Sequence, residues 1–299
     1  MSILTLIEQT NFSPSKQQAI EHIIALGWHV QDYTLKQLAQ ESYTVPATYV
    51  RLAKKLKYDG WNEFKEAFVK EIKYQQAHPL DFDLNIPFDN TDSILSIASK
   101  VTQLKITALE DTLELIDYKT FTQAVDLLHQ ARNIRIFASS VNLLLAQEFQ
   151  FKMNRMKRSV NISRLEGEHL YDILAMNQQD VALVISYSGS SEKMAEITEL
   201  LKQRQIKMIA ITSLTENILT RDADAVLYMA TREKLYSKIG QYSTNTSILH
   251  LLDLIYSALF AKNFQENLLY TIESAQIANF RKATARVMQE ENQQKKPNI

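Results

Sequence analysis

The 299-residue sequence contains no cysteine, and that absence alone excludes several kinds of site. Without thiols there is no disulfide, no thiolate metal site and no cysteine nucleophile. A chain without thiols is suited to a reducing compartment, so we expect a cytoplasmic protein.

Long apolar runs are also missing. The most apolar stretch, Ile248 to Ala261, is interrupted by His250 and Asp253 and is too short to cross a bilayer. The first residues lack a basic segment followed by a sustained apolar core, so the sequence predicts no secretory signal. We therefore expect no membrane among the partners.

The chain as a whole has no excess of charge of one sign. Its net charge is −1, from 33 basic and 34 acidic residues, which gives no global electrostatic argument for nucleic-acid binding. Basic residues are concentrated locally, however. Between positions 45 and 60 only Asp59 is acidic, and the basic residues are Arg51, Lys54, Lys55 and Lys57. This segment is a basic patch on an otherwise balanced chain.

Length and periodicity divide the chain into two folded units. A chain of 299 residues is long enough for two domains, and 45% hydrophobic and 22% charged residues are ordinary globular values. Up to residue 76 the apolar residues recur every three or four positions, which is typical of helices. Residues 77–91 contain two of the five prolines and no helical period. We predict a helical domain over residues 1–76 and a linker over residues 77–91.

The pattern changes after this linker. Four short apolar runs, IRIFA, VALVIS, KMIAIT and AVLYMA, alternate with helical segments between residues 134 and 230. Continuous apolar strands separated by helices are typical of a parallel sheet that is buried on both faces. We predict a doubly wound α/β domain over residues 92–285 and a polar, frayed tail over residues 286–299. The fold class is therefore α/β overall, preceded by an all-α bundle.

Within the helical part, two short helical segments match a helix-turn-helix unit. Thr34 is suited to cap the first segment, a four-residue polar break follows, and Pro46 is suited to the first turn of the second. In such a unit the second helix enters the major groove, where its first residues face base edges and its cations contact phosphates. The predicted base contacts are Ala47, Thr48, Tyr49 and Arg51, and the predicted phosphate contacts are Lys54, Lys55 and Lys57. A surface helix with a solvated basic face is the alternative, and Tyr49 could equally be a core residue.

A serine-rich turn directly follows the VALVIS run. Its residues are Ser186, Tyr187, Ser188, Gly189, Ser190 and Ser191, and a helical segment begins immediately after them. At the carboxyl end of a parallel strand, this arrangement places hydroxyls and backbone N–H groups around a helix N-terminus, where the dipole favours an anion. Gly189 permits the tight turn, and serines donate hydrogen bonds without adding charge. The turn predicts a phosphate site, although a serine that only caps the helix is the simpler alternative.

These motifs resemble a known family. The SYSGSS turn, with KMIAITS some twenty residues later, resembles the sugar isomerase (SIS) domain, and VPATYVRLAKKLKYDGWNEFKEAF resembles the helix-turn-helix of RpiR/MurR-type regulators. The resemblance implies that Ser186, Ser188 and Ser191 are phosphate-binding hydroxyls and that Ser190 lines the same turn.

The loop after the first strand departs from the family pattern, which is Gly-x-Gly-x-Ser. This sequence has Ala138 and Ser140 at the glycine positions and Asn142 at the serine position. The resemblance therefore implies that Ser140 or Asn142 contacts the sugar, unless this contact is lost. Each added side chain narrows the approach of the backbone to a ligand.

As a whole, the resemblance implies a transcriptional regulator that binds operator DNA and is controlled by a phosphorylated sugar. Because one small helix-turn-helix offers too few contacts for a specific site, we expect a homodimer or larger homo-oligomer. No catalytic residue, metal or cofactor is expected. A sugar-phosphate isomerase is one alternative, and its general base would be Glu166, His169 or Glu192. A dimerisation scaffold that has lost its ligand is another, which the altered first loop favours. The helix-turn-helix argues against the isomerase, because a catalyst has no use for it.

Overall fold

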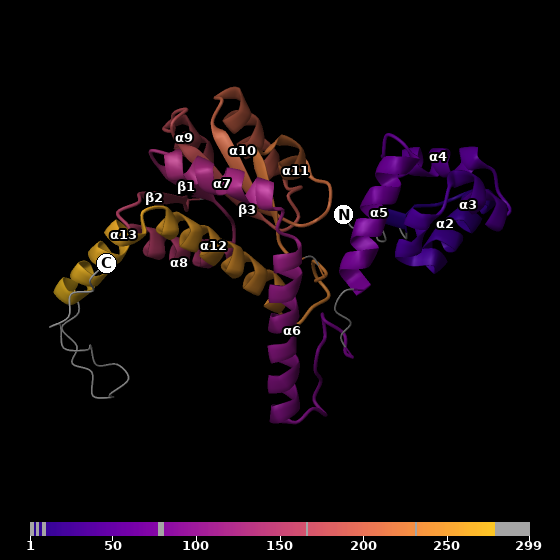
Figure 1. Cartoon of the computed structure of the whole chain (residues 1–299), viewed down its shortest axis with the longest axis horizontal. Coiled ribbons are helices and arrows are strands. Elements are labelled where there is room, and N and C mark those ends of the chain that lie inside the picture. Colours follow the sequence, from indigo (N-terminus) through magenta and orange to yellow (C-terminus); the bar gives the residue numbers. More distant parts are fainter. Residues whose placement is uncertain are drawn as a thin grey trace.

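The computed structural model describes residues 3, 6, 7, 10–76, 81–165, 167–230 and 232–278 (Figure 1). An all-α bundle is followed by an α/β unit, and the two build separate hydrophobic cores. This confirms the predicted fold class. Within the described ranges, none of the helices has the length and apolar character needed to cross a membrane.

Over residues 10–76, the N-terminal bundle is built from α-helices and one 3-10 turn. They are α2 (Pro14–Leu26), η1 (Gly27–Asp32), α3 (Leu35–Glu41), α4 (Pro46–Lys55) and α5 (Trp61–Gln76). Thr34 caps α3 in a reciprocal capping box with Gln37, and Pro46 is the first residue of α4, as predicted. Fully buried Leu38, Leu52 and Phe64 belong to the core that these helices share.

The α/β unit contains a five-stranded parallel sheet with the order β2-β1-β3-β4-β5. The strands are β1 (Ile134–Phe137), β2 (Val160–Ser163), β3 (Val181–Ser186), β4 (Lys207–Thr212) and β5 (Ala225–Tyr228). The four apolar runs of the sequence are β1, β3, β4 and β5. Strand β2 was not predicted, because Asn161 and Ser163 interrupt its apolar pattern.

Helices cover both faces of this sheet. Alternate residues of β3 point to opposite sides, so Leu183 packs with α7 (Tyr118–Gln130), α8 (Asn142–Asn154) and α12 (Tyr242–Lys262). Val184 packs on the other side with α9 (His169–Leu174), α10 (Glu192–Gln203) and α11 (Ile218–Asp222). The doubly wound architecture is therefore confirmed.

Two further helices flank the sheet domain. Helix α6 (Ile94–Glu114) joins α12 through a buried hydrogen bond of 2.7 Å from the Thr112 hydroxyl to Ser247 Oγ. Its first part extends beyond the α/β unit, and α13 (Phe264–Ala278) projects from the opposite end (Figure 1).

Residues 81–91 of the predicted linker contain neither helix nor strand. They are nevertheless anchored, because Asn85 and Pro87 are buried. The bundle also contacts the α/β unit directly, since Lys70 Nζ lies 4.9 Å from the centre of the Tyr228 ring. The domain boundaries remain a prediction, and residues 77–80 and the predicted tail lie outside the described residues.

Candidate phosphate site and nucleic-acid interface

The strand order places the two predicted ligand loops side by side. Strands β1 and β3 are neighbours, but β1 continues to β2 on one side of the sheet and β3 continues to β4 on the other. In open parallel sheets, ligands bind outside the carboxyl ends of the strands at such a switch point. The loop over residues 138–141 and the Ser186–Ser191 turn both begin there.

Hydrogen bonds within the serine turn fix its shape. The Gly189 N–H donates to Ser186 Oγ at 3.2 Å, and the Ser190 hydroxyl donates to the Ser188 carbonyl at 2.9 Å. Ser191 is the N-cap of α10, where its Oγ accepts from the Met194 N–H at 3.3 Å. Capping and anion binding are compatible, because a hydroxyl that accepts one hydrogen bond can still donate another.

The structure leaves no room for a side chain at Gly189. Its φ is +59°, and a Cβ would lie 2.2 Å from Asn217 Oδ1. Asn217 is itself held in place: it is 6% exposed, caps α11 by accepting from the N–H groups of Leu219 and Thr220, and donates to Thr212 Oγ1 at 3.2 Å. The serine turn therefore packs at Gly189 directly against Asn217, in the loop that follows β4.

In the altered first loop, a serine at one of the family's glycine positions has a left-handed backbone. Ser140 has a φ of +55°, a left-handed conformation that glycine adopts readily and serine rarely. Its side chain is exposed, and half-buried Asn142 begins α8 directly after it. A sugar contact from Ser140 or Asn142 remains a prediction.

The loop over residues 232–241 contacts the serine turn, a role that was not predicted from the sequence. The half-buried Tyr187 donates from its hydroxyl to the Glu233 carbonyl at 2.5 Å, and burial raises the pKa of Tyr187. The Glu233 carboxylate is 1% exposed and accepts from the Ser243 N–H at 2.6 Å and from Lys238 Nζ at 3.1 Å. This segment has no apolar period, so nothing in its pattern indicated a buried role.

Two of the three candidates for an isomerase base, His169 and Glu192, lie in the part of the chain that the structure describes, and no hydrogen bond or ion pair joins them there. His169 is buried, and its Nε2 lies 3.3 Å from Oε2 of Glu196, a residue that the sequence analysis did not single out. Glu192 is exposed on the first turn of α10. Glu166 lies outside the described residues.

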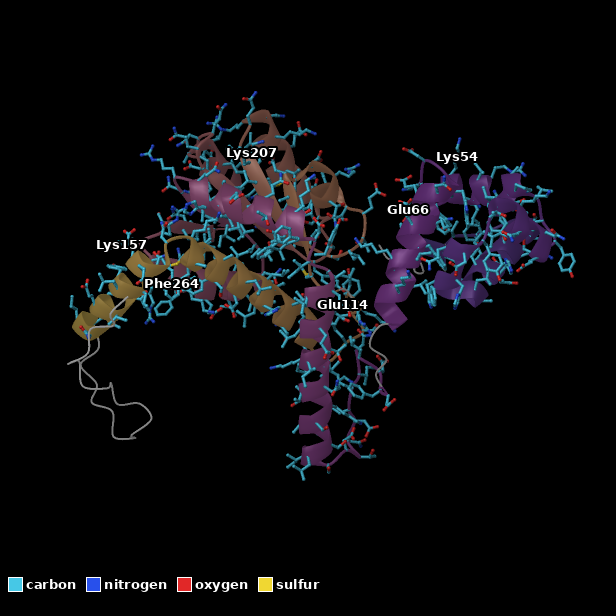
Figure 2. The ribbon with its side chains drawn as sticks, viewed as in Figure 1. Lys54, Glu66, Glu114, Lys157, Lys207 and Phe264 are labelled. Carbon is cyan, nitrogen blue, oxygen red and sulfur yellow. The ribbon has the colours of Figure 1, made fainter. Side chains whose placement is uncertain are left out.

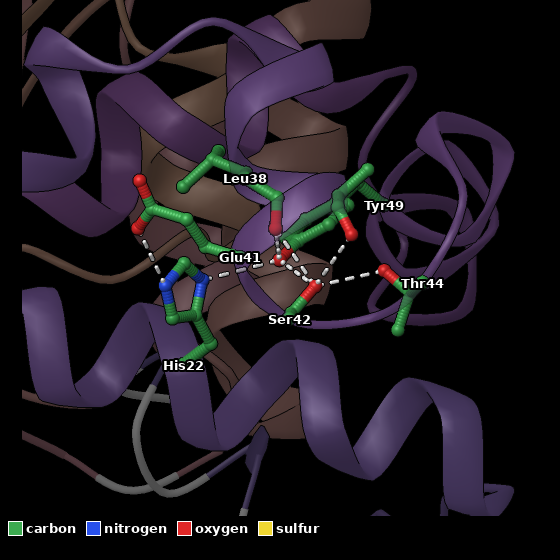
Figure 3. Close-up of polar contacts among 7 residues, drawn as sticks. His22, Leu38, Glu41, Ser42, Thr44 and Tyr49 are labelled. Carbon is green, nitrogen blue, oxygen red and sulfur yellow. Dashed lines mark hydrogen bonds and ion pairs between the residues drawn. The ribbon is translucent and has the colours of Figure 1, made fainter.

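In the helix-turn-helix, two of the predicted base contacts face the interior. Tyr49 is fully buried, and its hydroxyl donates to the Leu38 carbonyl at 3.0 Å and to Ser42 Oγ at 2.9 Å (Figure 3). Thr48 is 3% exposed. The prediction that Thr48 and Tyr49 face base edges is therefore wrong, because they lie on the helix side that packs against α2 and α3. The core alternative for Tyr49 is right, and burial raises its pKa.

The other predicted DNA contacts are exposed. They are Ala47, Arg51, Lys54, Lys55 and Lys57. Lys54 lies on the outer surface of α4 (Figure 2). Lys55 is already engaged, because its Nζ donates to the Asn11 carbonyl and lies 5.3 Å from the centre of the Phe12 ring. Lys55 is therefore less available to a phosphate than Lys54.

Tyr43 is a further surface residue of this unit, and it was not among the predicted DNA contacts. It lies in the turn between α3 and α4, is 93% exposed and has a φ of +52°. The left-handed backbone ends α3, because the Thr44 N–H donates to the Ala39 carbonyl at 2.8 Å, and it leaves the Tyr43 ring in solvent beside the start of α4. An aromatic residue within an otherwise polar break was the available signal.

Comparisons with known proteins agree with this architecture. Residues 127–258 match the family model of the SIS domain, so the C-terminal region of the chain carries a SIS domain. The chain is similar to an uncharacterized HTH-type transcriptional regulator of Clostridium perfringens, at 25% identity over 89% of this chain and 95% of the relative.

Two solved structures share the fold. The Vibrio vulnificus NanR protein complexed with ManNAc-6P has a TM-score of 0.58 at 20% identity, covering 93% of this chain and 98% of that chain. The sugar isomerase domain of an RpiR transcription factor from Sphaerobacter thermophilus has a TM-score of 0.54 at 16% identity, covering 60% of this chain and 98% of that chain. The resemblance to regulators that carry a SIS domain is confirmed at this level.

Proposed function

We propose that the chain is a DNA-binding transcriptional regulator of sugar-metabolism genes, controlled by a phosphorylated sugar in its SIS domain. One observation carries the proposal: a single chain combines an exposed basic face on α4 with a serine turn at the switch point of a parallel sheet. Residues 1–76 would be the DNA-binding domain and residues 92–285 the sensor. Such a role requires access to DNA, which supports the cytoplasm as its location.

The phosphate would lie in the Ser186–Ser191 turn. Ser186, Ser188 and Ser191 would donate to its oxygens, and the N-terminus of α10 would stabilise its charge. ManNAc-6P, the ligand in the NanR complex, is a rational first probe.

Calorimetry tests this assignment directly. Titration of the chain with ManNAc-6P and a panel of other phosphorylated sugars, each matched to its unphosphorylated form, should reveal at least one ligand that requires its phosphate. That ligand should also raise the melting temperature, because it binds only the folded state. If every member of a broad panel fails to bind, the sensor role is wrong.

Arg51→Ala is expected to weaken binding to operator DNA by about 1 to 3 kcal/mol, because a guanidinium can donate two hydrogen bonds to the major-groove edge of a guanine. Lys54→Ala should weaken binding to operator and scrambled DNA alike, because a phosphate contact carries no sequence information. Titration of both DNAs with each variant makes the comparison. Equal losses on both DNAs for Arg51→Ala would reassign Arg51 to a phosphate contact.

Tyr43→Gly is expected to have effects of opposite sign on folding and on binding. Glycine relieves the left-handed strain, so the bundle should be as stable as before or more stable by up to about 1 kcal/mol. Operator affinity should fall by about fivefold or more if the exposed ring contacts DNA. Tyr236→Gly, at a tyrosine that is 91% exposed in the α/β unit, is the control. Unchanged operator affinity for Tyr43→Gly would remove the ring from the interface.

The chain is expected to bind DNA as a dimer, because one small helix-turn-helix offers too few contacts for a specific site. Two helices present apolar side chains for such an interface. They are Ile94, Leu95, Ile106, Leu109 and Leu113 on α6, and Leu269, Ile272 and Ile277 on α13, each at least 38% exposed. Leu95→Asp combined with Leu109→Asp should give a monomer by light scattering and weaken operator binding. Gln103→Asp, at an exposed polar position on α6, should do neither. A monomeric wild type at operator-binding concentrations would contradict the dimer.

We also propose that the chain is a binding protein rather than an isomerase. The exposed basic face of α4 supports this proposal, because an isomerase has no use for a DNA-binding unit. The isomerase alternative would rely on His169, which is buried and paired with Glu196 across α9 and α10. Incubation with the bound sugar phosphate, followed by carbon-resolved NMR, should show no interconversion between aldose and ketose forms. Turnover that is lost in His169→Ala would overturn this assignment.

A further inference from the structure

The serine turn is connected to the loop over residues 232–241 by a short hydrogen bond. The Tyr187 hydroxyl donates to the Glu233 carbonyl at 2.5 Å. Glu233 cannot move independently, because its carboxylate accepts from the Ser243 N–H at 2.6 Å and from the Thr244 hydroxyl at 2.7 Å. The backbone at Glu233 is therefore held on one side by the serine turn and on the other by the N-terminus of α12.

The same loop holds the segment that joins the two domains. The Lys234 N–H, directly after Glu233, donates to Asn85 Oδ1 at 2.7 Å, and the Ile239 N–H donates to the Asn85 carbonyl at 2.9 Å. Asn85 is 8% exposed, although it lies in an irregular segment. Asp83 orients it, since its Oδ1 accepts from the Asn85 N–H at 2.8 Å. One asparagine thus fixes residues 83–87 to the α/β unit.

We infer that Asn85 is a latch through which the serine turn controls the linker to the DNA-binding domain. The inference rests on the proposed function, in which a phosphorylated sugar occupies that turn. Tyr187 lies within the turn, and its acceptor, the Glu233 carbonyl, belongs to the same planar peptide group as the Lys234 N–H that holds Asn85. A shift of Tyr187 on ligand binding therefore moves the group that holds the linker. The ligand controls the DNA-binding domains because its affinity differs between the latched and released states.

Amide hydrogen exchange without any ligand tests the latch itself. Asn85→Ala and Tyr187→Phe should each speed exchange of the Lys234 amide and of residues 81–93 by about fivefold, the effect of one net hydrogen bond. Asn90→Ala, at an exposed position of the same segment, should change neither. Tyr187→Phe removes a single oxygen and preserves packing, so it separates the relay from misfolding. If Tyr187→Phe leaves exchange of residues 81–93 unchanged, the relay is wrong.

A second arm uses inorganic phosphate as the probe. In the wild type, saturating phosphate should alter exchange at residues 186–191 and also at residues 81–93, while in Asn85→Ala and Tyr187→Phe only the first change should persist. An undiminished response of residues 81–93 in both variants would overturn the latch. Absence of any change at residues 186–191 in the wild type would instead count against the proposed phosphate site, and the ligand-free arm would still decide the latch.

Discussion

Ser191→Asp is expected to weaken binding of the phosphorylated sugar by more than about 100-fold, because like charges in close contact cost several kcal/mol. The free energy of unfolding should stay within about 0.5 kcal/mol of the wild type, because aspartate and serine are equivalent N-caps. The side chain at this position accepts from the Met194 N–H, and a carboxylate can do the same. Calorimetry with the sugar phosphate and urea unfolding of the same variant measure the two effects.

The control for this substitution is Ser93→Asp. Ser93 caps α6, and its side chain accepts from the Ser96 N–H at 3.2 Å, so it has the same structural role away from the serine turn. Ligand affinity should be unchanged in Ser93→Asp. Equal ligand affinity in Ser191→Asp and the wild type would show that Ser191 serves only as a cap and that the phosphate lies elsewhere.

Gly189→Ala is expected to destabilise the α/β domain by about 2 to 4 kcal/mol, through left-handed strain and the displacement of a buried, hydrogen-bonded side chain. The new Cβ would lie 2.2 Å from Asn217 Oδ1, so Asn217 would have to give up its cap on α11. Urea unfolding followed by circular dichroism measures the loss. The affinity for the phosphorylated sugar should also fall, because the serine turn would be displaced from its position beside Asn217.

Gly167→Ala separates the effect of backbone strain from the effect of displacing the Asn217 side chain. Gly167 has a φ of +87°, but a Cβ at this residue would meet nothing within 4 Å, so only the backbone strain of about 1 kcal/mol is expected. In a double-mutant cycle, Asn217→Gly should cost less in the Gly189→Ala background than in the wild type. Additive effects would show that Gly189 and Asn217 do not interact as the structure indicates.

Several features were predictable because they depend on neighbours in the sequence. Thr34 caps α3 through Gln37, three residues away, and Pro46 begins α4. The buried strand β3 and the turn at Gly189 after it were predictable in the same way. A run of apolar residues that is followed by a glycine and a helical segment is typical of a buried parallel strand that turns into a helix.

The predictions that failed concerned orientation. The basic residues of α4 identified the exposed side of that helix, but Thr48 and Tyr49 were assigned to it although they face inward. A tyrosine with its hydroxyl in a buried polar network looks the same in sequence as one that projects into solvent. Its hydrogen bonds to Leu38 and Ser42 depend on how α3 packs against α4.

The sequence by itself determined the order of domains, four of the five strands and the serine turn, because periodicity and turn chemistry are encoded within a few residues. Only the tertiary structure placed the first loop beside that turn, since the switch point arises from the strand order. Only it showed that Asn217 leaves no room beyond Gly189, and that Asn85 binds a loop 149 residues away. Contacts between distant segments depend on how whole elements pack, and no local pattern specifies them.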